Sequence, residues 1–367
     1  MPKKSLLILG CRGIPAEYGG FETFAQRLSV YLTSKGWSVT VYCQNYKSKE
    51  VFEGYWQDIH LVHLPVSGYD AVSSIIFDWK STIHAARQDS LILTLGYNTA
   101  IFCFWYRLKG LTNVINMDGL EWRRAKWKLP EKIWLYLNEW FGSWLGNHLI
   151  ADHPEIEKHL TSRVSAQKIT MIPYGTDPLE QVDVTLLEQY NLIPNEYVIV
   201  IARPEPENHI REIVSAFSSK KRTLKLVIIG LYLPVKLPYY KEIIEVASEE
   251  VIFPGRIYDK AIINTLRFYA RLYVHGHSVG GTNPSLVEAL AAGSAVLAHD
   301  NLFNRWVAGE GAYYFEDELD CIQKFDRLLA DSQELERMKE ASLKRYQEEF
   351  SEQKHLKAYE ALLTKFL

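Results

Sequence analysis

The feature that most constrains the fold is a repeating order of short aliphatic runs and helical patterns in both halves of the chain. Residues 5–9 read Ser-Leu-Leu-Ile-Leu, and residues 197–202 read Tyr-Val-Ile-Val-Ile-Ala. Each run is followed by a turn and then by apolar residues at helical spacing, as residues 21–34 and 209–218 show. Continuous aliphatic strands that alternate with helices indicate parallel sheets covered on both faces. The sequence therefore predicts an α/β protein with strands at residues 5–9, 38–43, 59–64, 91–95, 113–117 and 148–151, and at residues 197–202, 224–230, 251–254, 272–275 and 295–298.

The chain of 367 residues is long enough for two domains. A turn-rich stretch from Pro173 to Pro178 separates the two halves. We predict a Rossmann-like domain over residues 1–173 and a second over residues 174–345, facing one another across a cleft. Residues 346–367 are expected to form a C-terminal helix, for which the first domain is one candidate packing partner. Ligands of such folds bind at the carboxyl ends of the strands, where both halves carry a glycine-rich turn.

Composition excludes several classes of protein. Hydrophobic residues make up 47% of the chain and charged residues 23%, as in a folded globular protein. The formal net charge of −3 gives no general attraction to nucleic acid or to an anionic membrane. The four cysteines are scattered and form no Cys-x-x-Cys pair, so we expect a reducing compartment and no zinc site, and no motif calls for a cofactor.

The segment of residues 275–293 reads as the end of a strand, a glycine-rich turn and the start of a helix. Asn283 suits the N-cap, Pro284 suits the first helical position, and Gly293 suits the stop. The free N–H groups of such a start favour an anion. Glu288, one turn further along, could accept hydrogen bonds from hydroxyls beside that anion. Phosphate next to a diol describes a nucleotide, and the alternative is an ordinary helix start after two glycines.

The turn after the first strand is also rich in glycine. Gly13, Gly19 and Gly20 allow the backbone to approach a phosphate or a sugar closely. Ordinary turn glycines are the alternative, and it is stronger for Gly13 than for the adjacent pair.

Two further strings carry a resemblance to a known family. Residues 12–22 read Arg-Gly-Ile-Pro-Ala-Glu-Tyr-Gly-Gly-Phe-Glu, and residues 116–127 read Asn-Met-Asp-Gly-Leu-Glu-Trp-Arg-Arg-Ala-Lys-Trp. With the segment of residues 275–293 they resemble a GT-B glycosyltransferase of family 4, over nearly the whole chain. The two strings look like the bacterial branch that includes rhamnosyltransferases of capsule and cell-wall polysaccharide assembly.

The resemblance implies a retaining, metal-independent transferase with its donor on the second domain. The expected reaction moves L-rhamnose from dTDP-L-rhamnose onto a lipid-diphosphate-linked saccharide in cell-surface polysaccharide synthesis. One alternative is a GT-B transferase that uses another nucleotide sugar, of the UDP-glucose or UDP-GlcNAc type. Another is a non-catalytic protein that binds a nucleotide or a glycan.

The resemblance also assigns roles in the donor site. Glu288 matches the second glutamate of the family's E-x7-E motif, which holds the ribose hydroxyls. Gly280 stands where the first glutamate is expected, and its lack of a carboxylate fits a 6-deoxy donor sugar. The backbone amides of Gly281 and Thr282 are expected to face the diphosphate.

The same resemblance covers three further positions, Arg203, Asn208 and Ile257, and the spacing of two histidines adds His277. Arg203 matches the arginine that neutralises charge on the leaving diphosphate, or it is a surface arginine in a turn. The lysine expected five residues later is replaced by Asn208, and Arg211 is a candidate to supply the missing charge. Ile257 lies in the segment that contacts the base, largely through its backbone. His277, with His275 on the same face of an extended segment, is expected to contact the diphosphate or the sugar, or to be a structural histidine.

Asp118 follows a strand, where many relatives carry a histidine or an aspartate near the reacting sugar. It is a candidate base for the acceptor hydroxyl or a group that orients the acceptor. The alternative is a helix N-cap for the residues from Gly119 onward, and Glu121 is a secondary candidate.

Residues 97–145 interleave tryptophan and tyrosine with lysine and arginine. Such a pattern suits a bilayer interface, single-stranded nucleic acid, or an aromatic core helix with a solvated basic face. The resemblance favours the membrane, because related enzymes extend sugars on lipid-diphosphate carriers. We therefore expect a cytoplasmic protein bound peripherally to the inner face of the cell membrane, with no nucleic-acid partner.

Overall fold

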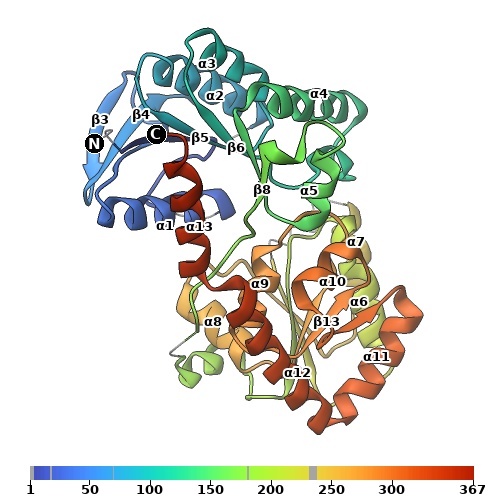
Figure 1. Ribbon diagram of the computed structural model, residues 1–367. Coiled ribbons are helices and arrows are strands. Elements are labelled where there is room, and N and C mark those ends of the chain that lie inside the picture. The colour runs from blue at the N-terminus through green and yellow to red at the C-terminus, as the bar shows by residue number, and fades with distance from the viewer. Residues whose placement is uncertain (1–3, 17–18, 69, 180–181, 231–237) are drawn as a thin grey trace. The chain divides into compact units, whose positions relative to one another are not determined.

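The computed structural model describes residues 4–16, 19–68, 70–179, 182–230 and 238–367, and it contains two separate sheets (Figure 1). The chain divides into two compact units. Unit 1 comprises residues 1–123, 127–173 and 355–367, and unit 2 comprises residues 124–126 and 174–354. Each unit has its own sheet and its own buried core.

Unit 1 is built on an eight-stranded sheet with the order β3-β4-β2-β1-β5-β6-β7-β8. All neighbouring strands run parallel except β3 and β4, which are antiparallel. The strands are β1 Ser5–Leu9, β2 Ser38–Asn45, β3 Phe52–Trp56, β4 Ile59–Pro65, β5 Leu91–Leu95, β6 Asn113–Asn116, β7 His148–Ala151 and β8 Ile169–Met171.

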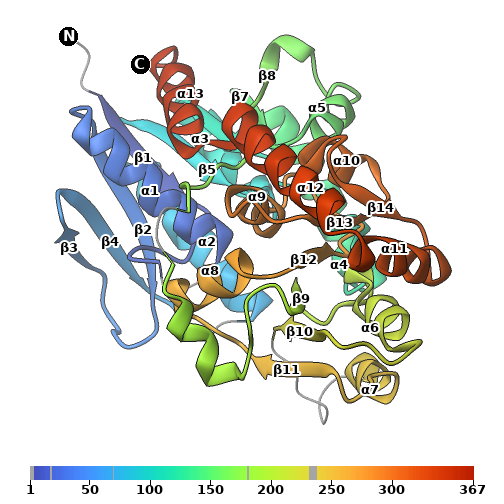
Figure 2. The same cartoon turned by 90° about the horizontal axis from the view of Figure 1, so that it is seen from below.

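Helices cover both faces of this sheet, because its central strands are apolar on both sides. Figures 1 and 2 show α1 and α13 next to one another on one face, with α2 and α3 on the other. Buried leucines of α1 and α13 pack against β1 and β2 in one continuous core. The helical elements are α1 Gly20–Ser34, α2 Ala71–Ala85, η1 Ala100–Cys103, α3 Phe104–Leu108, η2 Glu121–Arg123, α4 Leu129–Leu145, α5 Pro154–Leu160, η3 Ala166–Lys168 and α13 Glu352–Thr364.

Unit 2 is built on a six-stranded, fully parallel sheet with the order β11-β10-β9-β12-β13-β14. The strands are β9 Tyr197–Ile201, β10 Lys225–Ile229, β11 Val251–Gly255, β12 Leu272–His275, β13 Val296–His299 and β14 Tyr313–Phe315. One face is covered by a core that includes α6 and α11, and the other by a core that includes α8 and α9. The helical elements are η4 Val184–Tyr190, η5 Pro206–Asn208, α6 Ile210–Ser218, α7 Pro238–Glu245, α8 Lys260–Phe268, α9 Pro284–Ala291, α10 Leu302–Ala308, α11 Glu318–Ala330, α12 Ser332–Arg345 and the π-helical turn η6 Tyr346–Phe350.

Every predicted strand is present, and the predicted pair of parallel α/β sheets is confirmed. The sequence missed β3, β8 and β14. All three lie at a sheet edge, and β8 and β14 are only three residues long, so each pairs on one side and carries little hydrophobic pattern. Among the residues that the structure describes, no helix is long and apolar enough to cross a bilayer.

The C-terminal segment is not one continuous helix. The stretch predicted to be helical from residue 346 begins with the π-helical turn η6, and α13 starts at Glu352. Residues 355–367 group with unit 1, where Tyr359 accepts a 2.8 Å hydrogen bond from the Asn116 amide. The end of the chain is therefore part of the core of unit 1.

Replacing Leu363 of α13 by alanine should destabilise unit 1. Leu363 is 0% exposed and belongs to the core of β1 and α1. Such a cavity lowers the free energy of unfolding by about 2–5 kcal/mol. Calorimetry should show a lower melting temperature for the unit 1 transition. The control Leu319→Ala changes a side chain that is 70% exposed and should leave melting almost unchanged. Equal melting of Leu363→Ala and the parent would contradict this packing.

Candidate active site

The turn after β12 and the start of α9 form the centre of the candidate site in unit 2. The side chain of Asn283 accepts a 3.0 Å hydrogen bond from the Ser285 N–H, and Pro284 is the first helical residue. Gly293, just beyond the helix, has a φ of 64°, which suits the stop. The predicted N-cap, helix start and stop are therefore confirmed.

The two residues predicted to face a diphosphate precede this helix. Gly281 is half-buried, and Thr282 is buried. Pro284 has no N–H group, the Ser285 N–H is capped by the Asn283 side chain, and the N–H groups of Leu286 and Val287 donate to the Asn283 carbonyl oxygen. What the helix start offers is the positive end of its dipole, which lies at the Gly281–Thr282 turn. The local structure is one that favours an anion.

Glu288 lies one turn into α9, and its side chain is 42% exposed. Its Oε2 atom accepts a 2.7 Å hydrogen bond from Nη2 of Arg267, whose side chain is buried on α8. The Nη1 atom of Arg267 is also 3.4 Å from Oδ1 of Asn264. A buried guanidinium therefore fixes the orientation of the carboxylate while part of the glutamate stays accessible to a hydroxyl donor.

Arg267 is a residue that sequence reasoning missed. It lies 21 positions before Glu288, and nothing in the local pattern of α8 pairs the two. The only available signal was an arginine on a helix that otherwise packs against the sheet. An arginine that is almost fully buried normally has a charged partner.

Gly280 stands where the family resemblance expects a carboxylate. Its φ is 150°, and a Cβ atom built at this position would meet no heavy atom within 4 Å. The position is open and carries no side chain of its own. Ile257 follows β11 and packs, half-buried, against the core around α8 and α9. Its side chain is occupied by the core, so its backbone is the part that can contact a ligand.

Arg203 follows β9 and has a side chain that is 57% exposed. Its Nη1 atom lies 3.5 Å from Oε1 of Glu205. Asn208, which replaces the expected lysine, is buried, and its Nδ2 donates a 2.8 Å hydrogen bond to the Arg203 carbonyl oxygen. Asn208 therefore shapes the Arg203 loop.

Arg211, the candidate to supply the missing charge, lies 4.0 Å from Glu242 and 3.9 Å from Glu318, so two carboxylates already neutralise its charge.

His275 and His277 are stacked, with ring centroids 4.3 Å apart, so the prediction that they share one face is confirmed. His275 is fully buried, and burial lowers its pKa to about 3, helped by His299. Burial also lowers the pKa of His277 well below its usual value, and the nearby His275 and Arg203 act in the same direction. Both imidazoles are therefore uncharged at neutral pH, and His277 lies near Arg203.

A second histidine pair adjoins the first and was not predicted. The rings of His209 and His299 stack at 4.1 Å, and Nδ1 of His209 lies 2.8 Å from the Gly276 carbonyl oxygen. Burial, and the charge that His209 would carry, lower the pKa of His299 to about 4. The four histidines come from three different strand ends, so their clustering is visible only in the folded chain.

The predicted glycine-rich turn of unit 1 lies between β1 and α1. Glu17 and Tyr18, which are part of the matched string, lie outside the described residues. Gly19 has a φ of 107°, and a Cβ there would stand 2.0 Å from Oε2 of Glu22. The other oxygen of Glu22 accepts a 2.9 Å hydrogen bond from the Arg12 N–H. Gly19 is thus required by the local fold, and both Gly19 and Gly20 are exposed at the start of α1.

Asp118 lies two residues after β6 in the left-handed conformation, with a φ of 51°. Its N–H donates a 2.9 Å hydrogen bond to Oδ1 of Asn116. The first helical turn after it begins at Glu121 rather than at Gly119, so Asp118 is not next to a helix start. The N–H of Glu121 donates to the hydroxyl of Tyr97 at 2.8 Å. A non-glycine residue held in this conformation by its neighbours is a frequent feature of functional sites.

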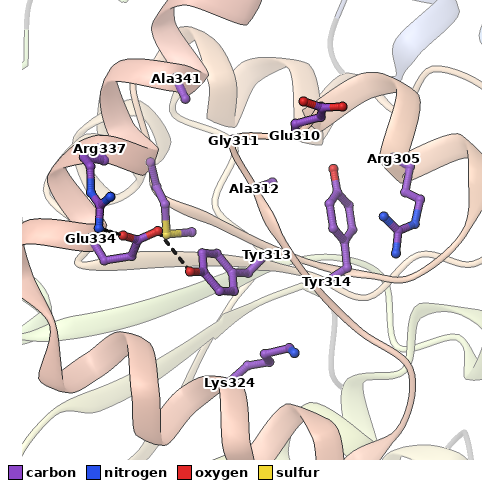
Figure 3. Close-up of a pocket in the computed structure, with 11 residues that line it drawn as sticks. Arg305, Glu310, Gly311, Ala312, Tyr313, Tyr314, Lys324, Glu334, Arg337 and Ala341 are labelled. Carbon is purple, nitrogen blue, oxygen red and sulfur yellow. Dashed lines mark hydrogen bonds and ion pairs between the residues drawn. The ribbon is translucent and has the colours of Figure 1, made fainter.

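A separate cavity of about 540 Å³ lies in unit 2 beside β14 and α12 (Figure 3). Among its charged groups, Glu334 pairs with Arg337 and accepts a 3.0 Å hydrogen bond from Tyr313. Arg305 and Lys324 pair with Asp300 and Asp320, which are not part of the lining. None of the predicted site residues lines it. Within the described part of the chain there is also no group of three or more His, Cys, Asp or Glu residues that could hold a metal ion.

Comparison with protein families divides the chain between residues 177 and 188. Residues 3–177 match the family described as Domain of unknown function (DUF1972), and residues 188–345 match Glycosyl transferases group 1. No match was found among curated proteins.

Solved structures with the same fold cover nearly the whole chain. Sucrose-phosphate synthase from Thermosynechococcus elongatus matches with a TM-score of 0.80 and 16% identity over 99% of this chain and 98% of that one. Anabaena HepE in complex with UDP and glucose matches with a TM-score of 0.78 and 14% identity, over 98% and 99% of the two chains. The α,α-trehalose 6-phosphate synthase from Burkholderia multivorans matches with a TM-score of 0.73 and 11% identity, over 99% and 96%. The predicted GT-B fold is confirmed, and the chain joins an N-terminal DUF1972 domain to a C-terminal domain of the group 1 glycosyltransferases.

Proposed function

We propose that the chain is a retaining glycosyltransferase that moves L-rhamnose from dTDP-L-rhamnose onto a lipid-diphosphate-linked saccharide in cell-surface polysaccharide synthesis. The observation that carries the donor class is the Gly281–Thr282 turn at the start of α9, with Glu288 fixed by Arg267 one turn further along. This arrangement offers partial positive charge to a diphosphate and a carboxylate to a ribose diol. The structure of HepE in complex with UDP and glucose supports a nucleotide sugar as the donor class.

The choice of rhamnose depends on Gly280. In the E-x7-E motif this position carries a carboxylate that touches the transferred sugar, whereas here it is open and has no side chain. A donor that lacks the 6-hydroxyl needs fewer polar partners, and the uncharged His277 can serve as a hydrogen-bond donor or acceptor. The alternative is a UDP-glucose or UDP-GlcNAc type donor, which the HepE complex with UDP-glucose favours.

Arg203 and Asp118 receive the remaining chemical roles. The exposed guanidinium of Arg203 is assigned to the charge that develops on the leaving diphosphate. Asp118, held in a strained conformation after β6, is assigned to the acceptor hydroxyl as base or orienting group. We propose that no metal ion takes part, because a cationic side chain and a helix start already supply positive charge. A protein that only binds a nucleotide or a glycan is the remaining alternative.

The proposed membrane contact is made by α4. Leu129, Ile133, Leu137 and Trp144 are exposed along one side of this helix, with Lys128 and Lys132 at its start. An apolar stripe with basic residues suits a bilayer interface. We propose that it holds the protein on the inner face of the cell membrane, in the cytoplasm.

Some of the aromatic residues of the predicted surface bind other parts of the protein instead. Trp122 donates a 2.7 Å hydrogen bond to Glu139, and Trp140 stacks under Arg163 at 4.2 Å, so both have structural roles. Residues 124–126 group with unit 2, whereas α4 belongs to unit 1. The exposed stripe of α4 is therefore the better candidate for docking.

The donor is tested by calorimetric titration with dTDP, UDP, dTDP-L-rhamnose, UDP-glucose and UDP-GlcNAc. We expect dTDP-L-rhamnose to bind most tightly and to be turned over in the presence of EDTA. Glu288→Ala should weaken dTDP binding by about 1.5–3 kcal/mol, the typical size of a hydrogen bond to a charged group. Leu302→Ala, a change at an exposed position of α10, is the matched control. If only a UDP-sugar is turned over, the donor is that sugar nucleotide and not dTDP-L-rhamnose. Unchanged dTDP affinity in Glu288→Ala would contradict the proposed contact between Glu288 and the ribose.

Asp118→Asn should reduce turnover by about 10²–10⁴-fold while nucleotide affinity stays at the parental value. The amide keeps the shape and the main-chain conformation that Asp118 adopts, because asparagine tolerates positive φ. Steady-state rates and calorimetry on the same preparation separate the two effects. Turnover equal to that of the parent would return Asp118 to a purely structural role.

A triple variant, Leu129→Gln, Ile133→Gln and Leu137→Gln, should lose binding to anionic vesicles. Parental binding should fall as salt rises, because each nearby lysine contributes about 1 kcal/mol that is screened over roughly 10 Å at 0.1 M salt. The control carries Val51→Gln, Phe52→Gln and Tyr55→Gln, which are exposed in and beside β3 of the same unit. If the folded α4 variant sediments with vesicles as well as the control does, α4 is not the docking surface.

A further inference from the structure

An apolar cavity of about 430 Å³ lies in unit 1 where α2, η1, α3 and α4 pack together. Its walls are formed mainly by Trp79, Phe102, Phe104, Trp105, Phe141 and Leu145, and all the residues that line it are apolar. None of the predicted donor or acceptor residues is among them. A cavity with such walls offers no hydrogen bonds to water, so its natural occupant is a hydrocarbon.

The aromatic walls are held in fixed positions. The ring of Trp79 makes edge contacts with Phe102 at 5.1 Å and with Trp105 at 6.0 Å. The side chains of Trp79, Phe104 and Trp105 are nevertheless exposed. A contiguous group of exposed aromatic residues around an apolar hollow marks a site for interaction with another molecule.

Positive charge adjoins the cavity. Arg107 donates hydrogen bonds to the carbonyl oxygens of Leu145, at 2.8 Å, and of Trp144 and Gly146, at 3.2 Å. The Nζ atom of Lys168 donates to the carbonyl oxygen of Trp144 at 3.2 Å. Two cations therefore gather at the end of α4, directly beside the cavity residue Leu145.

Negative charge is sparse on the same side. The sequence from Ser90 to Met117 contains Arg107 and Lys109 but no aspartate or glutamate. On α2, the carboxylate of Asp78 accepts a 2.8 Å hydrogen bond from Thr99, and burial raises its pKa to about 6. An apolar hollow with a cationic rim is complementary to an anionic amphiphile.

We propose that this cavity holds the end of a hydrocarbon chain of an anionic bilayer lipid, whose phosphate lies beside Arg107 and Lys168. This deepens the membrane part of the proposed function and rests on it. The exposed stripe of α4 would lie on the bilayer surface, whereas the cavity would take up a single chain. A second copy of the protein would need an acidic and apolar surface of matching shape, and the net charge of the cationic rim favours lipid instead.

The test uses octyl, decyl and dodecyl phosphate below their micelle-forming concentrations, titrated into the whole protein by calorimetry. Each methylene that enters the cavity should tighten binding about fourfold, which is the transfer free energy of one CH₂ group expressed as an affinity ratio. The gain should stop once the chain fills the cavity. Salt should weaken binding of the phosphates and leave the alcohols of equal length unaffected.

Two tryptophan variants form a matched pair for this test. Trp105 lines the cavity and is 36% exposed, whereas Trp134 lies on α4 away from the cavity lining and is 38% exposed. Trp105→Ala should weaken decyl phosphate binding at least tenfold, and Trp134→Ala should not change it. Melting curves of both variants check that they are folded, and the chain-length series on the parent protein keeps the proposal testable if either is not.

Several outcomes would overturn the proposal. The first is an affinity for alkyl phosphates that does not depend on chain length, and the second is an equal loss of decyl phosphate affinity in Trp105→Ala and Trp134→Ala. The third is a prenyl phosphate that binds more than tenfold tighter than an alkyl phosphate of equal carbon number, which would point to a lipid carrier. Self-association of the parent that Trp105→Ala abolishes would point to a second copy. Glu288→Ala should bind decyl phosphate like the parent, so failure of the donor assignment and failure of the cavity assignment give different results.

Discussion

The close approach of two loops in unit 2 is the constraint on which the candidate donor site depends. A Cβ at Gly276 would stand 2.0 Å from the Asn208 carbonyl oxygen, so only glycine lets the loop after β12 lie against the loop after β9. Ser278 then donates hydrogen bonds through its N–H and hydroxyl to the Glu207 carbonyl oxygen. This contact sets where His277 and the Gly281–Thr282 turn lie relative to Arg203. A side chain at position 276 would separate the two strand ends that carry the proposed diphosphate contacts.

Burial of the clustered histidines controls the charge of the candidate donor site. The four clustered histidines could carry positive charge in water, but His275 and His299 have pKa values of about 3 and 4, and that of His277 is also strongly lowered. We therefore propose Arg203 and the start of α9, rather than His275, His277 and His299, as the source of positive potential for an anion. The lysine and the glutamate that the family resemblance expects are both absent, so the site has lost one charge of each sign. The open position at Gly280 and the uncharged His277, which we propose to lie beside the sugar, are consistent with that balance.

Local patterns were sufficient for the parts of the fold that depend on neighbouring residues. Asn283, Pro284 and Gly293 predicted the limits of α9 because capping and helix termination act over a few positions. The aliphatic strands were predicted for the same reason. The partner of Glu288 was not, because Arg267 comes from another helix and the pair forms only when α8 and α9 pack on one face of the sheet. The histidine cluster was half predicted, since His275 and His277 are neighbours in sequence whereas His209 and His299 are not.

The aromatic residues between positions 97 and 145 show why composition alone does not identify a docking surface. Its tryptophans look equivalent in sequence, yet Trp122 is bound to the buried carboxylate of Glu139, while Trp105 forms the wall of an open cavity. Three hydrogen bonds, from Trp122, His159 and Arg163, outweigh burial and lower the pKa of Glu139, so this carboxylate is a structural anchor for α4. The buried face of α4 is thereby committed to the protein, and its opposite face keeps Leu129, Ile133 and Leu137 exposed. An anchored helix with an unpaired apolar side is suited to a bilayer surface, because the energy of docking is not spent on ordering the helix.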